Sequence, residues 1–169
     1  QDNVVGSLRF TVAHASPLGA STVTFAPGLS GQSLQITSGQ IVLDGNMTLD
    51  GSGFSPSLQI DAGNNNRIFF VKSNATVTIN LLSLTRGYAS GTPGVRGIDG
   101  TTSTVATLGT DGLPGQGGGI YNAGTLTLNQ SILTGNIAIG GQGGAGGWNT
   151  NNGFLPGNGG NAVVFSERL

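Results

Sequence analysis

The sequence contains no cysteine and very little charge. Its 169 residues include six Lys and Arg, seven Asp and Glu, and one His, which gives a formal net charge of −1. Without cysteine there is no disulfide framework, no thiolate nucleophile and no Cys-based metal site. With so few cations there is no basic stripe for nucleic acid and no polybasic face for a membrane. Low net charge favours association, because little repulsion keeps copies apart.

Long apolar runs are also missing. No stretch approaches the roughly 20 residues that span a bilayer, so membrane insertion is not expected. The chain begins at Gln1 with neither Met nor signal peptide. We interpret it as a processed, exported protein, with an internal fragment of a longer chain as the alternative. The triplets beginning at Asn46, Asn74 and Asn129 match the N-glycosylation pattern, which is frequent by chance.

One short segment has helical periodicity. Leu8, Val12 and Ala15 share one face of residues 7–15, and Ser7 is a suitable N-cap. All later periodicity has period two, in very short strands rich in Val, Ile, Leu and Thr and separated by Gly, Asn, Asp and Ser.

Three of the period-two segments repeat one another. Residues 39–51, 75–87 and 124–136 align, with Gly45 as a bulge in the first copy. The alignment predicts three inward columns: Ile41/Val77/Leu126, Leu43/Ile79/Leu128 and Leu49/Leu84/Leu133. It also predicts a turn ladder of Asp44, Asn80 and Asn129, whose side chains tolerate left-handed backbone and could hydrogen-bond between rungs.

Strands this short need neighbours in order to be stable. Coiling the chain so that equivalent strands stack about 4.8 Å apart pairs their backbone groups and buries one continuous column. A β-sandwich is the alternative, but it normally has longer strands joined by tight hairpin turns. The pattern therefore favours a coiled, parallel arrangement.

Several segments resemble the CSLREA-type β-helix modules of bacterial surface and secreted proteins. The resemblance lies in residues 6–10, 21–31, 34–43, 47–51 and 118–128. The Gly-Gly-Ile within 118–128 and the later 134–136 are also similar to repeats of polymorphic outer-membrane proteins. Gly6 replaces a frequent Cys, and Phe10 a usual acidic residue. The resemblance, which covers residues 6–90 and 117–138, implies a parallel β-helix whose first helix caps the core. It carries no common catalytic set.

We therefore predict an all-β fold, a right-handed parallel β-helix (β-solenoid) with an N-terminal capping helix and glycine-rich, polyproline-II-like insertions. The expected single domain, 1–169, has these parts: capping helix 7–15, first rungs 21–90, insertion 91–118, rung 119–138, insertion 140–160 and terminal strand 161–169.

Glycine recurs at every third residue in the insertions. With 32 residues it has about 2.5 times its usual share. Gly at every third place with Pro between is typical of polyproline II packing, because three residues make one turn and only Gly permits close backbone approach. The series are Gly91, Gly94, Gly97 and Gly100, then Gly109, Gly112, Gly115 and Gly118, and then Gly141, Gly144 and Gly147.

Three interpretations of the glycine series compete: a flexible loop, a collagen-type homotrimer, and runs stacked side by side or against a neighbouring subunit. We favour the third. The glycines, together with Val163 and Phe165 of the terminal strand, are then the predicted assembly residues. A strand at 161–169 without a cap would offer unpaired backbone groups to another chain.

No catalytic set emerges from the sequence. The acids are scattered, the single His14 lies on the capping helix, and no Gly-Lys-Ser or Gly-Lys-Thr follows the glycines. Trp148 could stack on a sugar, but we expect it to anchor the glycine-rich segment. The protein is therefore predicted not to be an enzyme and to bind no cofactor or metal.

The favoured function is a secreted structural protein, a subunit of a self-assembling extracellular fibre, sheath or surface layer, with copies of itself as partners. The alternative is an adhesin-like, carbohydrate-binding module that contacts cell-surface glycans. Ice binding ranks third, because the outward Thr48, Thr78 and Thr127 do not form a repeated Thr-x-Thr grid in the sequence.

Overall fold

The chain divides into two compact units. The computed structural model describes residues 5–15, 19–55, 57–148 and 164–165. Of these, residues 5–89 and 117–137 form one unit, here called the strand unit, and residues 90–116, 138–148 and 164–165 form the other, the glycine unit. The strand unit largely coincides with the predicted rungs, and the glycine unit with the predicted insertions.

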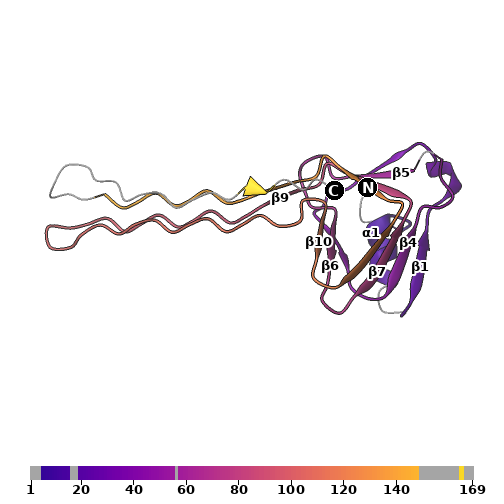
Figure 1. Ribbon diagram of the computed structural model, residues 1–169, viewed down its shortest axis with the longest axis horizontal. Helices are drawn as coiled ribbons and strands as arrows, with labels where there is room; N and C mark the ends of the chain where they lie inside the picture. The colour runs from indigo at the N-terminus through magenta and orange to yellow at the C-terminus, as the bar shows by residue number, and fades with distance from the viewer. Residues whose placement is uncertain (1–4, 16–18, 56, 149–163, 166–169) are drawn as a thin grey trace. The chain divides into compact units, whose positions relative to one another are not determined.

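Short strands dominate the described part of the chain, and one short helix precedes them (Figure 1). The elements are α1 (Leu8–Ala15), β1 (Ser21–Thr24), the 3-10 turn η2 (Pro27–Leu29), β2 (Ser33–Gln35), β3 (Ile41–Leu43), β4 (Met47–Asp50), β5 (Leu58–Asp61), β6 (Phe69–Val71), β7 (Thr76–Asn80), β8 (Leu82–Thr85), β9 (Tyr88–Ser90), β10 (Ile120–Asn122), β11 (Thr125–Asn129), β12 (Ile132–Thr134), β13 (Ile137–Ile139) and β14 (Val164–Phe165).

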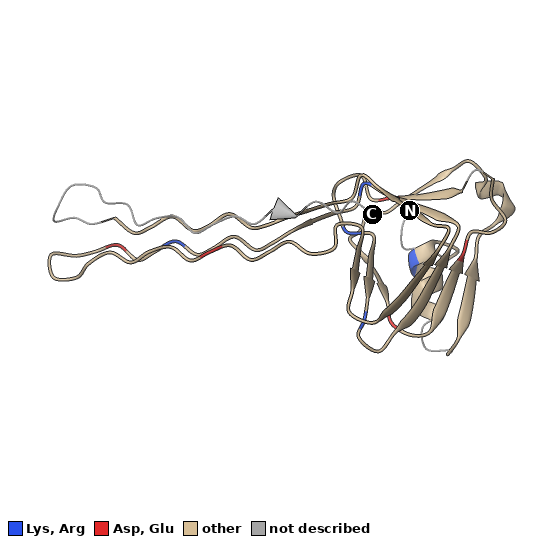
Figure 2. Cartoon of the chain, viewed as in Figure 1, with Lys and Arg blue, Asp and Glu red and all other residues tan. Residues whose placement is uncertain are grey.

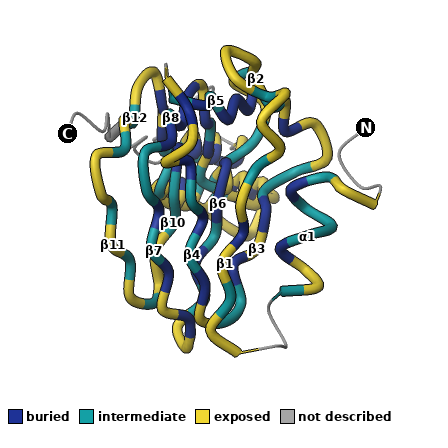
Figure 3. The backbone as a smooth tube through the Cα atoms, turned by 90° about the vertical axis from the view of Figure 1, so that its right-hand side faces the viewer, coloured by how far each residue is buried: buried dark blue, intermediate teal, exposed yellow. Residues whose placement is uncertain are grey.

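Three sheets of parallel strands make up the strand unit. Their orders are β1-β4-β7-β11, β10-β6-β3 and β12-β8-β5-β2, and the register is parallel in each pair. Consecutive strands belong to different sheets, so the chain returns to each sheet one rung later (Figure 3). This confirms a β-solenoid-like, all-β arrangement and contradicts the antiparallel sandwich.

A fourth sheet has the order β14-β13-β9. In it β14 pairs antiparallel with β13, Phe165 opposite Ala138 and Val164 opposite Ile139. The expected terminal strand is therefore two residues long where it is described, and it does not extend the parallel stack. Val163 lies outside the described residues.

The repeat alignment is wrong by one strand in its first copy. Val77 and Leu126 stack on Met47, and Ile79 and Leu128 stack on Leu49. Ile41 and Leu43 belong instead to the sheet of β6 and β10. Likewise, Leu84 and Leu133 stack on Ile60 rather than on Leu49.

The physical reason for this shift is the turn at Gly45. The four residues of β4 match β7 without any gap, whereas the alignment through β3 needed an inserted residue. Gly45, at φ 144°, lies between β3 and β4 and is not a bulge within a strand. The residues predicted to point inward still do so: Ile41, Leu43, Val77 and Ile79 are at most 1% exposed.

The N-terminal helix forms where predicted and packs on the first rung. The hydroxyl oxygen of Ser7 accepts a hydrogen bond from the Phe10 amide at 3.3 Å, which is the expected N-cap. Leu8 and Val12 join the buried core cluster, and α1 contacts β1 and β3. The imidazole of His14 is exposed and stacks on Phe10, with 3.9 Å between ring centroids.

Three extended runs lie side by side in the glycine unit (Figure 1): run A (91–100), run B (104–116) and run C (139–148). Run A donates to run C (Gly94 N–H to Gln142 O, 2.7 Å), run C donates to run B (Gly144 N–H to Thr110 O, 2.9 Å) and run B donates to run A (Thr110 N–H to Val95 O, 2.9 Å). The pattern recurs every three residues, as expected for polyproline II packing. Runs A and C are parallel, and run B is antiparallel to both.

This arrangement decides among the three interpretations of the glycine series. The runs are neither loops without partners nor a collagen-type homotrimer, because one chain supplies all three and reverses one of them. They pack side by side within the chain.

Candidate functional site

The glycines of the three series face the backbone of neighbouring segments. A Cβ added to Gly94 would lie 2.0 Å from the Thr110 carbonyl oxygen, and one on Gly144 would lie 2.0 Å from that of Val95. Comparable clashes, within 2.1 Å of a carbonyl oxygen, arise at Gly91, Gly97, Gly109, Gly112, Gly115, Gly141 and Gly147.

The two remaining glycines of the series, Gly118 and Gly100, have less severe clashes. A Cβ on Gly118 would lie 2.3 Å from the Ile137 oxygen, and one on Gly100 would lie 2.8 Å from the Thr104 oxygen. The expectation that glycine faces meet neighbouring molecules is therefore corrected. These faces are filled by the same chain, because the antiparallel run B lets three runs close on one another.

A regular outer face is formed where runs A and B meet. Opposite residues there are Thr92 and Leu113, Val95 and Thr110, and Ile98 and Thr107, and in each pair the residue of run B donates its N–H to the carbonyl of run A at 2.9 Å. All six side chains are exposed, and none is charged. We call this set of six residues the ladder face.

Threonine hydroxyl groups of run B form hydrogen bonds with backbone amides of run A along the ladder face. The Thr110 hydroxyl oxygen accepts a hydrogen bond from the Val95 amide at 2.7 Å, and that of Thr107 accepts one from the Ile98 amide, also at 2.7 Å. At the turn between the runs, the Thr104 hydroxyl oxygen accepts from the Thr101 amide at 3.1 Å. The hydroxyl oxygens of three threonines of run B, spaced three residues apart, therefore each accept a hydrogen bond from a backbone amide. These bonds fix the side-chain conformations of the three threonines.

Threonine is also aligned on the strand unit. Thr22, Thr48, Thr78 and Thr127 are in register across β1, β4, β7 and β11. The outward threonines therefore form a single column of four, which is not the repeated Thr-x-Thr grid that is missing from the sequence. The sequence did not show this because the first-copy alignment placed β3, not β4, beside β7. Thr76 and Thr125 pair beside the column, and a shallow hollow of about 260 Å³ lies at its edge.

The turn ladder is correct in two of its three members. The Asn129 side-chain amide donates to Asn80 Oδ1 at 2.9 Å. The residue in register with Asn80 on β4 is Asp50, not Asp44. Asp44 follows β3 in another sheet, where its carboxylate pairs with Lys72 at 2.5 Å.

Asp61 has a buried carboxylate with several hydrogen-bond donors. It is 2% exposed and accepts hydrogen bonds from Arg86 Nε (2.9 Å), the Gly63 amide (2.8 Å) and Gln35 Nε2 (3.1 Å). The Arg86 guanidinium holds the pKa of this carboxyl below its ordinary value, with help from the Gly63 and Gln35 donors and against the opposing effect of burial. The Asp61 carboxylate ties three segments of the chain together.

A third ion pair lies in the glycine unit, where Arg96 and Asp99 are 2.5 Å apart. The Arg96 hydrogen bond lowers the pKa of Asp99, and the Trp148 amide, which donates to the same carboxylate at 2.8 Å, lowers it further. Trp148 is thus tied to run A through its backbone, while its side chain is 51% exposed.

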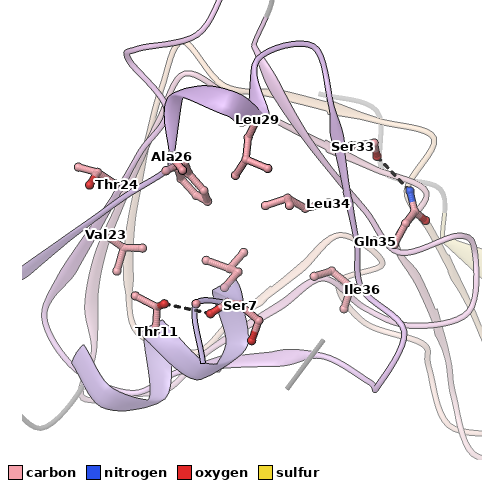
Figure 4. Close-up of a pocket in the computed structure, with 13 residues that line it drawn as sticks. Ser7, Thr11, Val23, Thr24, Ala26, Leu29, Ser33, Leu34, Gln35 and Ile36 are labelled. Atoms are coloured by element: carbon pink, nitrogen blue, oxygen red, sulfur yellow. Dashed lines mark hydrogen bonds between the residues drawn. The ribbon is translucent and has the colours of Figure 1, made fainter. Parts of the chain in front are cut away.

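A cavity of about 310 Å³ lies between α1 and the first rung (Figure 4). Val23, Phe25, Leu29, Leu34 and Ile36 line it together with the hydroxyls of Ser7 and Thr11. No titratable side chain is among its lining residues, so it offers no acid or base.

Charged side chains are few and scattered over both units (Figure 2). Within the described residues, no group of three or more His, Cys, Asp or Glu side chains could hold a metal ion. No helix in the same residues is long and apolar enough to cross a membrane. Comparisons with protein-family models, curated proteins and solved structures find no match to this chain.

Proposed function

We propose that the protein is a secreted, non-enzymatic structural module of an extracellular surface, built as a right-handed parallel β-helix, which associates with a second copy through the last rung of its strand unit. Right-handedness is supported by the near-universal handedness of connections between parallel strands. Secretion and a cell-surface location are supported by the resemblance to bacterial surface modules.

One observation carries the proposal: within the described residues, the last rung is open on its outer side. No strand among the described residues pairs with the outer edges of β10, β11 or β12. Leu126, Leu128 and Leu133 are only partly buried there, whereas the residues beneath them, Val77, Ile79 and Leu84, are 0% exposed. Unpaired backbone groups beside apolar side chains are a template for another β-edge.

The opposite end of the stack determines how two copies can meet. Helix α1 packs on β1 and β3 of the first rung (Figure 3), and Arg9 Nη1 donates to the Gln40 carbonyl at 2.8 Å. Because this end is covered, head-to-tail stacking is obstructed, and the open rungs meet tail to tail. Such a contact is self-complementary and closes as a pair, so a fibre or layer would grow by joining pairs through another surface.

The non-enzymatic part of the proposal is supported by the state of the acids. Asp44, Asp61 and Asp99 are each held in an ion pair with a neighbouring Lys or Arg. Cell-surface glycans stay a predicted partner class. The aromatic pair that could contact a sugar is Phe70 and Tyr121, whose ring centroids lie 5.4 Å apart, with Arg67 5.3 Å from the Tyr121 ring.

The pairing is tested with Leu128→Lys. Leu128 points inward at the open edge, so the Lys ammonium can reach water in the single molecule but would be buried in the pair. Thr127→Lys, on the same strand but pointing outward, is the matched control. Sedimentation velocity over a range of concentrations should show that the parent and Thr127→Lys pair, while Leu128→Lys stays monomeric with an unchanged circular dichroism spectrum. A parent that is monomeric at the highest concentration, or a Leu128→Lys variant that pairs equally well, contradicts the proposal.

A further inference from the structure

The ladder face is an exposed apolar surface that the association proposed above does not use. Val95, Ile98 and Leu113 are 70%, 74% and 60% exposed on it. Isolated exposed apolar residues are ordinary, but a contiguous set on a fixed scaffold calls for a physical explanation. Each of these residues also lies opposite a threonine, so the face displays hydroxyl and alkyl groups in alternation.

We propose that the ladder face binds the surface of ice. Its ligand is then an ordered lattice of water molecules rather than a solute or a polymer chain. This role is separate from pairing through the open rung, and the two can fail independently.

Regular spacing is the first support for this assignment. One pair of the ladder face follows another every three residues, and three residues of polyproline II conformation rise about 9.3 Å. Because every pair has the same hydrogen bond between runs A and B, side chains at equivalent positions repeat with that period. A periodic solid can match a periodic face at several points at once, whereas a small dissolved molecule gains nothing from the repetition.

Rigidity is the second support. Thr107 and Thr110 are each held by a 2.7 Å hydrogen bond from the opposite run. Their hydroxyl oxygens accept these bonds, which leaves each O–H free to donate outward. Since the side chains are already ordered in the free protein, binding costs little side-chain entropy. Preorganisation of this kind matters most when each contact is weak.

The chemistry of the face separates ice from the other ligands. Sugars are typically held by aromatic rings with planar amide, carboxylate or guanidinium groups, and the six ladder residues include none of these. A charged polymer would need charge, which the face also lacks. A face that binds ice needs only single hydroxyl groups that can hydrogen-bond with water molecules of the lattice. Its alkyl groups must leave the neighbouring ordered water undisturbed.

The test uses the whole chain and slowly growing ice, with the fraction of protein taken into the ice and the thermal hysteresis as readouts. Ile98→Lys places a strongly hydrated charge in the middle of the face. Leu108→Lys is the matched control, because Leu108 is 67% exposed and lies one residue from Thr107, on a different side of the three-fold run. The parent and Leu108→Lys should enter the ice, and Ile98→Lys should lose at least several-fold in both readouts.

Folding of each variant is checked through the amide hydrogen exchange of Gly94 and Gly97, whose N–H groups bond run C. Exclusion of the parent from ice overturns the proposal. An equal loss of ice binding in the two variants also overturns it. Retention of ice binding by Ile98→Lys overturns it as well and would assign the binding to another surface, such as the threonine column of the strand unit. A change of oligomeric state in Ile98→Lys alone would identify the ladder face as a protein interface and would equally reject ice as its ligand.

Discussion

At the scale of single residues, Asp61 shows how a buried charge can serve folding alone. The carboxylate ends β5, and its donors come from β2, from the following turn and from Arg86, which follows β8. Arg86 has a positive φ of 54°, which turns the chain so that the guanidinium reaches back to Asp61. In the sequence, Gln35, Gly63 and Arg86 lie 26, 2 and 25 residues from Asp61, respectively. No local pattern joins such residues, so the cluster could not be predicted.

Asp61 should make stability depend on acid pH. The pKa of its carboxyl is lower in the folded protein than in the unfolded chain, so its contribution is complete above the unfolded value of about 3.9 and is lost as the pH falls through the lower, folded value. Denaturant unfolding of the parent should therefore show a fall in the free energy of unfolding below about pH 4. Asp61→Asn should cost roughly 1–3 kcal/mol at neutral pH and flatten this acid dependence.

Asp44→Asn is the control for that experiment. It removes the carboxylate from a pair whose side chains are 44% and 40% exposed, so its cost should stay below about 1 kcal/mol. If Asp61→Asn unfolds no more easily than Asp44→Asn, the Asp61 cluster does not hold its three segments together.

At the scale of elements, the glycine series illustrates what a period can and cannot predict. Gly at every third residue indicates which side of a run allows close approach, and this could be predicted from residues such as Gly94 and Gly144. The period is the same in all three runs, so it cannot indicate which run lies opposite or whether that run belongs to the same molecule. The answer depends on the turn at 101–104, which reverses run B and lets it accept hydrogen bonds from run C.

The prediction of which strands are neighbours was wrong for a related reason. The short strands β3 and β4 both resemble β7, and the turn at Gly45 separates them. Alternation correctly predicted which side chains point inward, because it depends only on residue parity. It could not predict which strand is the neighbour, because that depends on turn geometry.

Gly144→Val should loosen the glycine unit and leave the strand unit intact. The new Cβ would lie 2.0 Å from the Val95 carbonyl oxygen, and the other atoms nearest to it are also backbone, which cannot turn aside as a flexible side chain could. Amide hydrogen exchange should become faster at Gly94 and Gly97 and stay unchanged at Val77 and Ile79. Ala145→Val, at the next and exposed position, is the control and should leave both sets protected. Unchanged exchange of Gly94 in Gly144→Val would contradict the described packing of the runs.

At the scale of the whole molecule, the two units are stabilised by different means. The strand unit buries a column of aliphatic side chains that runs through successive rungs, whereas the described runs of the glycine unit are joined by backbone hydrogen bonds and expose their apolar side chains. The all-β, coiled character of the first could be predicted, because short period-two strands have few other stable arrangements. The compactness of the glycine unit could not be predicted, because its packing depends little on the burial of hydrophobic side chains.

The aliphatic column therefore carries the stability of the strand unit, and Ile79 is the residue to test. It is 0% exposed and stacks between Leu49 and Leu128. Ile79→Asp would bury a carboxylate without a partner and remove apolar contacts to two rungs, which together should cost more than about 4 kcal/mol, a large part of the 5–15 kcal/mol of a typical domain. Thr78→Asp introduces the same charge one residue earlier, on the outer face, and should cost less than about 1 kcal/mol. Circular dichroism and limited proteolysis should find Thr78→Asp folded and Ile79→Asp without its β-structure. If the two variants are equally stable, Ile79 does not face a continuous core, and the stacked-rung architecture is wrong.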